Sequence, residues 1–90
     1  MQNQSIAIAY PPGLNAEAAT IFVQKANTYR SSIWVEHNAS RVNAKSLLGL
    51  LSLGLAAGEK ITLIVEGVDE SEATRGLLWL IETNFDTMSK

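Results

Sequence analysis

The spacing of apolar positions in the first third of the chain predicts one strand and one helix. Ser5–Tyr10 is typical of a short strand, with Ile6 and Ile8 on one face, and a Pro-Pro-Gly turn ends it. From 16 to about 27, apolar side chains recur at the i, i+3, i+4, i+7 spacing of a helix with one buried face. Asn15 is placed to cap this helix through its side-chain oxygen.

Three further strands are expected in the middle of the chain. Ser32–Glu36 is rich in β-branched and aromatic residues, and Asn38 marks a turn into a short strand around Arg41 and Val42. This pair predicts a hairpin. Lys60–Glu66 alternates apolar and polar residues, which indicates a strand with one buried face.

Two more helices complete the predicted elements. A short one begins at Ser46 and is closed by Gly54 or Gly58. The last begins at Asp69, where Glu72 three residues later resembles a capping box. Its apolar stripe consists of Ala73, Leu77, Leu80 and Ile81.

The order β, α, β, β, α, β, α predicts a single α+β domain over residues 1–90. In such a domain, three helices cover one face of a mostly antiparallel four-stranded sheet. Ferredoxin-like folds share this order, and the short middle helix argues against them. The polar tail after Phe85 is expected to fray.

Composition narrows the classes of function. The chain has no cysteine, so it can form neither a disulfide nor a thiolate metal site. Its seven Lys and Arg residues are scattered and the net charge is −2, which argues against direct nucleic-acid binding. No apolar run has the length of a membrane span or follows a signal-peptide pattern. We therefore expect a cytoplasmic protein with no membrane contact, cofactor or bound metal.

Leucines lie on two faces of the helix that begins at Ser46. At about 100° per residue, Leu47, Leu48 and Leu51 share one face, while Leu50 and Leu53 fall on the other. We assign Leu50 and Leu53 to the core and the first three to contact with a partner protein. The alternative is that all five pack inside a leucine-rich core.

Ser46 itself has two explanations. Serine is a preferred helix N-cap, and a capping serine needs no regulatory role. A phosphoserine is also compatible with this position, because free N–H groups and the positive end of the helix dipole stabilise its charge. Lys45 next to it supplies a positive charge for the phosphate or for an acidic group of a partner.

One segment, Val42-Asn43-Ala44-Lys45-Ser46, is specific enough to indicate a family. Weaker matches along the chain are Gly13-Leu14, Phe22-Val23, Gly49, Ser52-Leu53-Gly54 and Ile61-Thr62-Leu63. In these residues the chain resembles the HPr proteins of the bacterial phosphoenolpyruvate-dependent sugar phosphotransferase system. The resemblance implies an open-faced sandwich fold and a serine, Ser46, that is phosphorylated by HPr kinase/phosphorylase.

Two departures from the HPr pattern affect its phosphate-carrying loop, which here reads Gly13-Leu14-Asn15-Ala16-Glu17-Ala18-Ala19. Asn15 stands where the family has the histidine that accepts phosphate. A carboxamide nitrogen is not a nucleophile, so no phosphate can be carried there. Glu17 replaces an arginine and repels a phosphoryl donor. The one histidine, His37, is expected to be a solvated hairpin residue without catalytic function.

A chain that keeps the serine and lacks the histidine resembles the catabolite-repression HPr-like (Crh) branch of the family. That resemblance implies a regulatory protein, not an enzyme, whose phosphorylated form binds a CcpA-type transcription factor. Glu17 is expected near a phosphate on Ser46, with a repulsion on the order of 1–2 kcal/mol. The expected partner-binding residues are Leu47, Leu48, Leu51, Asn15, Glu17 and Lys45.

The sequence is compared with three candidate functions. The first is regulation of carbon catabolism through Ser46, and the second is an unphosphorylated module that competes with HPr for enzyme I or a metabolic enzyme. The third, ordinary phosphate carriage in sugar transport, conflicts with Asn15. A monomer or weak dimer is expected, and Trp34 and Trp79 are interpreted as partly buried anchors.

Overall fold

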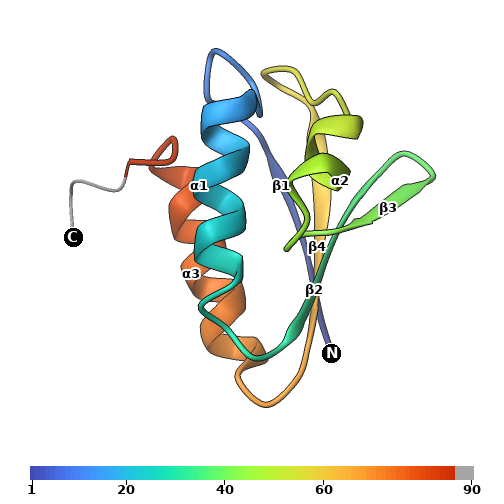
Figure 1. Ribbon diagram of the computed structural model, residues 1–90, viewed down its shortest axis with the longest axis vertical. Coiled ribbons are helices and arrows are strands. Elements are labelled where there is room, and N and C mark those ends of the chain that lie inside the picture. Colours follow the sequence, from blue (N-terminus) through green and yellow to red (C-terminus); the bar gives the residue numbers. More distant parts are fainter. Residues whose placement is uncertain (87–90) are drawn as a thin grey trace.

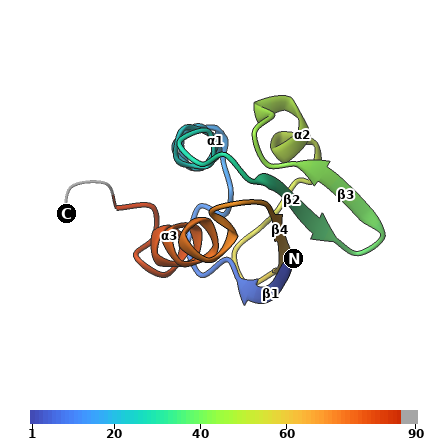
Figure 2. The ribbon, with the colours of Figure 1, turned by 90° about the horizontal axis from the view of Figure 1, so that it is seen from below.

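The helices all lie on one face of the sheet and leave the other face open (Figures 1 and 2). The computed structural model describes residues 1–86. Its helices are α1 (Ala16–Ala26), α2 (Leu47–Ser52) and α3 (Glu70–Glu82). In spatial order, its antiparallel strands are β1 (Gln2–Ala7), β4 (Lys60–Glu66), β2 (Ser32–His37) and β3 (Ser40–Asn43). The predicted α+β open-faced sandwich is thus confirmed.

Strand β4 organises the core because it pairs with both β1 and β2. Its alternating residues Ile61, Leu63 and Val65 are buried against the helices, as the sequence predicted. Burial of such side chains contributes roughly 1.5–3 kcal/mol each. The same alternation directs Ile64 toward the face that carries no helix.

Strand β1 begins and ends earlier than predicted. Its six residues pair with β4 from Gln2 opposite Val65 to Ala7 opposite Lys60. Ile8 has left the strand and is buried beside the loop before β4, where it donates to the Glu59 carbonyl oxygen at 2.9 Å. The apolar pattern gave the wrong ends for β1 because backbone pairing with β4, and not burial of side chains, sets the bounds of this polar edge strand.

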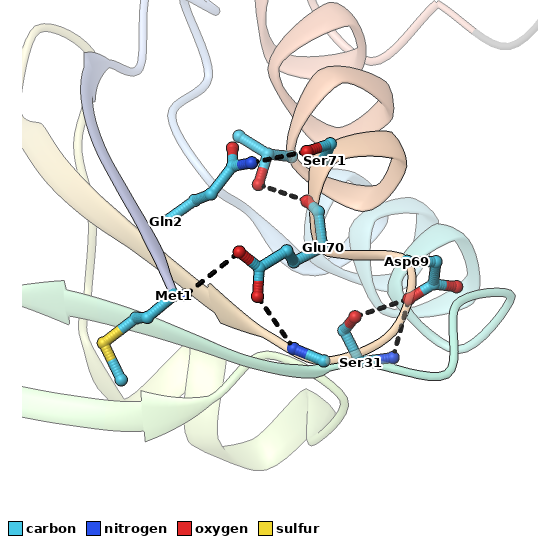
Figure 3. Close-up of polar contacts among 8 residues, drawn as sticks. Met1, Gln2, Ser31, Asp69, Glu70 and Ser71 are labelled. Carbon is cyan, nitrogen blue, oxygen red and sulfur yellow. Dashed lines mark hydrogen bonds and ion pairs between the residues drawn. The ribbon is translucent and has the colours of Figure 1, made fainter.

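The capping box predicted at the start of α3 is wrong. Asp69 occupies the N-cap position, but its carboxylate makes no capping hydrogen bond. It accepts hydrogen bonds from Ser31 instead, as Figure 3 shows, and one from the Arg30 backbone N–H, while Glu70 accepts one from the Gly67 backbone N–H. A distant loop therefore binds the group that local spacing assigned to the helix.

The two tryptophans are half-buried, in line with the interpretation as partly buried anchors. Trp79 packs against the hydrophobic core from α3. Trp34 lies in β2 between the buried residues Ile33 and Val35, so strand alternation places it on the open face. Of the predicted polar tail, residues 87–90 lie outside the described part of the chain.

Candidate functional site

The loop before α1 presents Asn15 at the surface. Its side-chain oxygen accepts a hydrogen bond from the Ala18 N–H at 2.9 Å, which confirms the predicted N-cap. Gly13 precedes it with a φ of 73°, and the Leu14 N–H donates to the Leu55 carbonyl oxygen at 3.0 Å. The loop is therefore held by backbone contacts to the segment that follows α2.

The exposed side chains of this loop lack a group for phosphoryl transfer. Asn15 offers a carboxamide whose oxygen already caps the helix. Glu17 lies exposed in the first turn of α1, where the helix dipole stabilises its negative charge. This end of α1 consequently carries an acid instead of the cationic and imidazole groups that would bind and accept a phosphoryl group.

Ser46 begins α2 as its N-cap. Its Oγ accepts a hydrogen bond from the Gly49 N–H at 3.1 Å, and its backbone is extended. The helix has only six residues, and Gly54, with a φ of 59°, follows its C-cap. Gly54, and not Gly58, thus closes this helix.

Gly49 is a part of this site that sequence reasoning missed. A Cβ at this position would lie 3.3 Å from both Ser46 Oγ and Val42 Cβ. The sequence feature that could have revealed this role is a glycine inside a short apolar helix. Because glycine has a low helix propensity, its presence there suggests that close packing requires it. Gly49 leaves room around the Ser46 hydroxyl.

The leucines of α2 divide as predicted. Leu48 is 81% exposed, and Leu47 and Leu51 are exposed at 37% and 36%. Leu50 is completely buried, and Leu53, just after the helix, is half-buried and packs against the core. The alternative in which all five are buried is therefore wrong, and three leucines form an exposed apolar surface beside Ser46.

Helices α1 and α2 are neighbours that run in opposite directions (Figures 1 and 2). The Leu14–Leu55 hydrogen bond joins the start of α1 to the segment after α2. At the other end, Lys45 reaches Tyr29, which follows α1. Glu17 and Ser46 therefore lie at the starts of two helices that run in opposite directions, and the repulsion expected between Glu17 and a phosphate on Ser46 stays a prediction.

Lys45 is less free than expected. Its Nζ donates a hydrogen bond to the Tyr29 carbonyl oxygen at 2.9 Å, and the side chain is half-buried. Its backbone N–H also donates to Asn43 Oδ1. The ammonium group therefore has a fixed position at the loop between α1 and β2.

His37 is not the solvated turn residue that the sequence predicted. It ends β2, and its side chain is only 18% exposed. Its Nε2 lies 3.0 Å from Glu59 Oε1, and its Nδ1 lies 3.1 Å from the Lys60 carbonyl oxygen. The ring thus connects the hairpin to the start of β4, a contact that only the folded chain creates.

The described part of the chain holds neither a metal-ligating cluster nor a membrane-spanning helix. Residues 1–86 contain no group of three or more His, Asp or Glu side chains arranged to hold a metal ion. Within the same range, no helix is both long and apolar enough to cross a membrane.

Comparison with known proteins identifies the architecture around this site. The family described as "PTS HPr component phosphorylation site" matches residues 2–83. The HPr-like protein Crh of Halalkalibacterium halodurans is 44% identical over 82 residues, which span 91% of this chain and 98% of that protein.

Solved structures give the same result. HPr-C-His from Thermoanaerobacter tengcongensis superposes with a TM-score of 0.92 at 45% identity, over 94% of this chain and 96% of that one. Crh from Bacillus subtilis, described as a swapped dimer, has a TM-score of 0.75 at 37% identity. That match covers 97% of this chain and all of the other.

Proposed function

Because the chain belongs to the HPr family, we propose that it is a regulatory HPr-like protein that is phosphorylated on Ser46. It acts in carbon catabolite regulation through protein contacts and does not carry phosphate at position 15. The observation that carries this proposal is the retention of Ser46 beside three exposed leucines, together with a carboxamide at Asn15. The protein is a cytoplasmic non-enzyme in this proposal.

The surroundings of Ser46 are compatible with phosphorylation. Ser46 is a half-exposed residue whose hydroxyl caps α2, so a phosphate there meets the free N–H groups of the first turn. A phosphoserine carries about −1.5 to −2 charge, which the positive end of the helix dipole stabilises. Modification therefore changes the surface charge without breaking the helix.

The proposed docking surface comprises Leu47, Leu48 and Leu51. Phosphorylation of Ser46 would add a negative charge next to these exposed apolar side chains. Such a surface suits a partner that contacts both the leucines and the phosphate. The partner class is a CcpA-type transcription factor, and the modifying enzyme is an HPr kinase/phosphorylase. Asn15 and Glu17, at the start of α1, belong to the proposed partner-binding surface, and so does Lys45, which precedes Ser46 in the chain.

The direct test is incubation with HPr kinase/phosphorylase and ATP, followed by mass spectrometry of the intact protein and its peptides. One added phosphate on Ser46 is expected, and the Ser46→Ala variant should gain none. A parallel reaction with phosphoenolpyruvate and enzyme I should leave no acid-labile phosphate. If the kinase leaves Ser46 unmodified, the regulatory proposal is wrong.

A second candidate is an unphosphorylated module that uses the same leucines to compete with HPr for enzyme I or a metabolic enzyme. The specific observation in its favour is that Leu48 is exposed without any modification. Capture of such a partner by Ser46→Ala at undiminished affinity supports this candidate, and loss of capture supports the first. As a monomer or weak dimer, the chain would expose this surface in either case.

A further inference from the structure

A notch opens where the chain turns away from β2 at the end of β3. It is a half-open hollow of about 110 Å³ that is lined by Ser32, Ile33, Trp34, Asn43 and Lys45. Trp34 and Asn43 are direct partners in the β2–β3 register, so their side chains share one face of the sheet. This notch is separate from the exposed leucines of α2.

The polar side chains around the notch favour an anion. Lys45 Nζ donates one hydrogen bond to the Tyr29 carbonyl oxygen and has two further N–H groups. Within the described residues it has no ion-pair partner. Asn43 Oδ1 already accepts a hydrogen bond from the Lys45 backbone N–H. The side-chain NH₂ of Asn43 is therefore the group that can donate a hydrogen bond to an anion. The Ser32 hydroxyl adds another donor. None of the lining residues is acidic.

Within residues 1–86, neither of the two neighbouring carboxylates, Glu66 and Glu36, forms an ion pair with Lys45. Glu66 is the direct partner of Ser32 on β4, so its exposed side chain lies on the same face as Ser32, on the side away from β3. Glu36 lies 3.6 Å from Arg41, with which it forms an ion pair. The two N–H groups of Lys45 that remain are therefore available to an external anion.

The size of the notch and the half-exposed Trp34 define that ligand further. The volume has room for several water molecules, and therefore for a phosphate group, but not for a whole sugar or nucleotide. Trp34 offers a flat apolar ring beside it, on which a saturated sugar ring or a base can stack. We propose that the notch binds a small phosphate monoester, with its phosphate on Lys45 and Asn43 and its ring against Trp34.

The test is an NMR titration of the whole ¹⁵N-labelled chain with inorganic phosphate, glucose 6-phosphate, adenosine monophosphate and glucose. Saturable shifts are expected at the Trp34 indole N–H and the Asn43 side-chain amide for the phosphorylated compounds, and none for glucose. Tighter binding of glucose 6-phosphate identifies a sugar phosphate as the ligand class, and tighter binding of adenosine monophosphate identifies a nucleotide. Absence of saturable shifts at these groups for every phosphate overturns the proposal.

Variants separate this site from general charge effects. Lys45→Met removes the ammonium with little loss of chain length and should weaken monoester binding about tenfold, the effect of losing one charge-assisted hydrogen bond. The matched control Lys60→Met removes an exposed lysine outside the notch and should change nothing. Equal weakening by both variants would show non-specific attraction and overturn the assignment.

The aromatic contact has its own readout. Trp34→Ala should weaken the monoester and leave inorganic phosphate unaffected, provided that its amide spectrum remains that of the folded protein. Equal affinity of Trp34→Ala and the parent chain for the monoester contradicts the stacking role. Ser46→Ala should bind as the parent does, because Ser46 does not line the notch. Failure of this proposal therefore leaves the regulatory proposal for Ser46 intact.

Discussion

Ser31 donates both its backbone N–H and its hydroxyl to the same oxygen, Oδ1, of Asp69, 38 residues further along the chain. The other carboxylate oxygen accepts the Arg30 N–H at 2.9 Å. Through these bonds, the loop before β2 is attached to the N-cap residue of α3, and Figure 3 shows the two bonds from Ser31. The carboxylate is thus used for tertiary connection rather than for capping.

The first prediction concerns acid stability. The hydrogen bond from the Ser31 hydroxyl, followed by the one from the Arg30 backbone, lowers the pKa of Asp69 below its ordinary value of 3.8. The folded state therefore binds fewer protons than the unfolded state in this range. The stabilisation by Asp69 is complete above the ordinary pKa and is lost as the pH falls through the lower folded value.

Asp69→Asn should accordingly be less stable than the parent at neutral pH, and the difference should shrink in acid. Thermal or urea denaturation of both proteins, from neutral pH to below the ordinary pKa of Asp69, measures this. Glu70 needs the same comparison with Glu70→Gln, because the Gly67 N–H lowers its pKa too. A difference that stays constant with pH would contradict the role of the Asp69 charge.

The second prediction concerns Gly13. An added Cβ would lie 2.6 Å from the Leu55 carbonyl oxygen, and the residue has a φ of 73°. Gly13→Ala should therefore reduce the free energy of unfolding by more than about 1 kcal/mol. Gly54→Ala is the matched control, because Gly54 shares the positive φ but has open space around it. Equal losses in the two variants would exclude the clash.

The third prediction distinguishes the two faces of α2. Leu50→Ala should destabilise the fold by about 2–5 kcal/mol, since the side chain is fully buried. Leu48→Ala should change stability by less than about 0.5 kcal/mol, because the side chain is exposed. Urea denaturation measures both. Binding to the regulatory partner should show the reverse order, with Leu48→Ala as the folded but weakly binding variant.

The fourth prediction concerns phosphate carriage at position 15. Asn15→His should give the chain an imidazole nucleophile at the start of α1, and adding Glu17→Arg should attract the phosphoryl group. Acid-labile phosphate from phosphoenolpyruvate and enzyme I is expected in the double variant and in smaller amount in Asn15→His. If Glu17→Arg adds nothing to the single variant, the charge at position 17 does not control phosphoryl transfer.

Local spacing was sufficient for much of the site. Both N-caps, Asn15 and Ser46, act through the side-chain oxygens that their positions predicted. The exposed position of Leu48 and the buried position of Leu50 followed from the angle between successive residues of a helix. These features depend on neighbours within one or two helical turns, and that is why the chain reveals them without its fold.

Contacts between distant segments were out of reach of such reasoning. The attachment of Lys45 to Tyr29 and of His37 to Glu59 depends on which loops the sheet brings together. Asp69 was mistaken for a capping residue because Ser31 competes for its carboxylate only after folding.

The amino-acid sequence by itself determined the order of elements, the apolar faces of α1, β4 and α3, and the carboxamide cap of Asn15 at the start of α1. The tertiary structure decided where β1 lies along β4, how α1 and α2 are oriented, and which donors surround the notch at Lys45. The physical reason is the separation along the chain of the residues that interact. Periodic burial and capping are local properties of a helix or strand, whereas register, helix orientation and ion-pair partners arise from contacts between segments far apart in the chain.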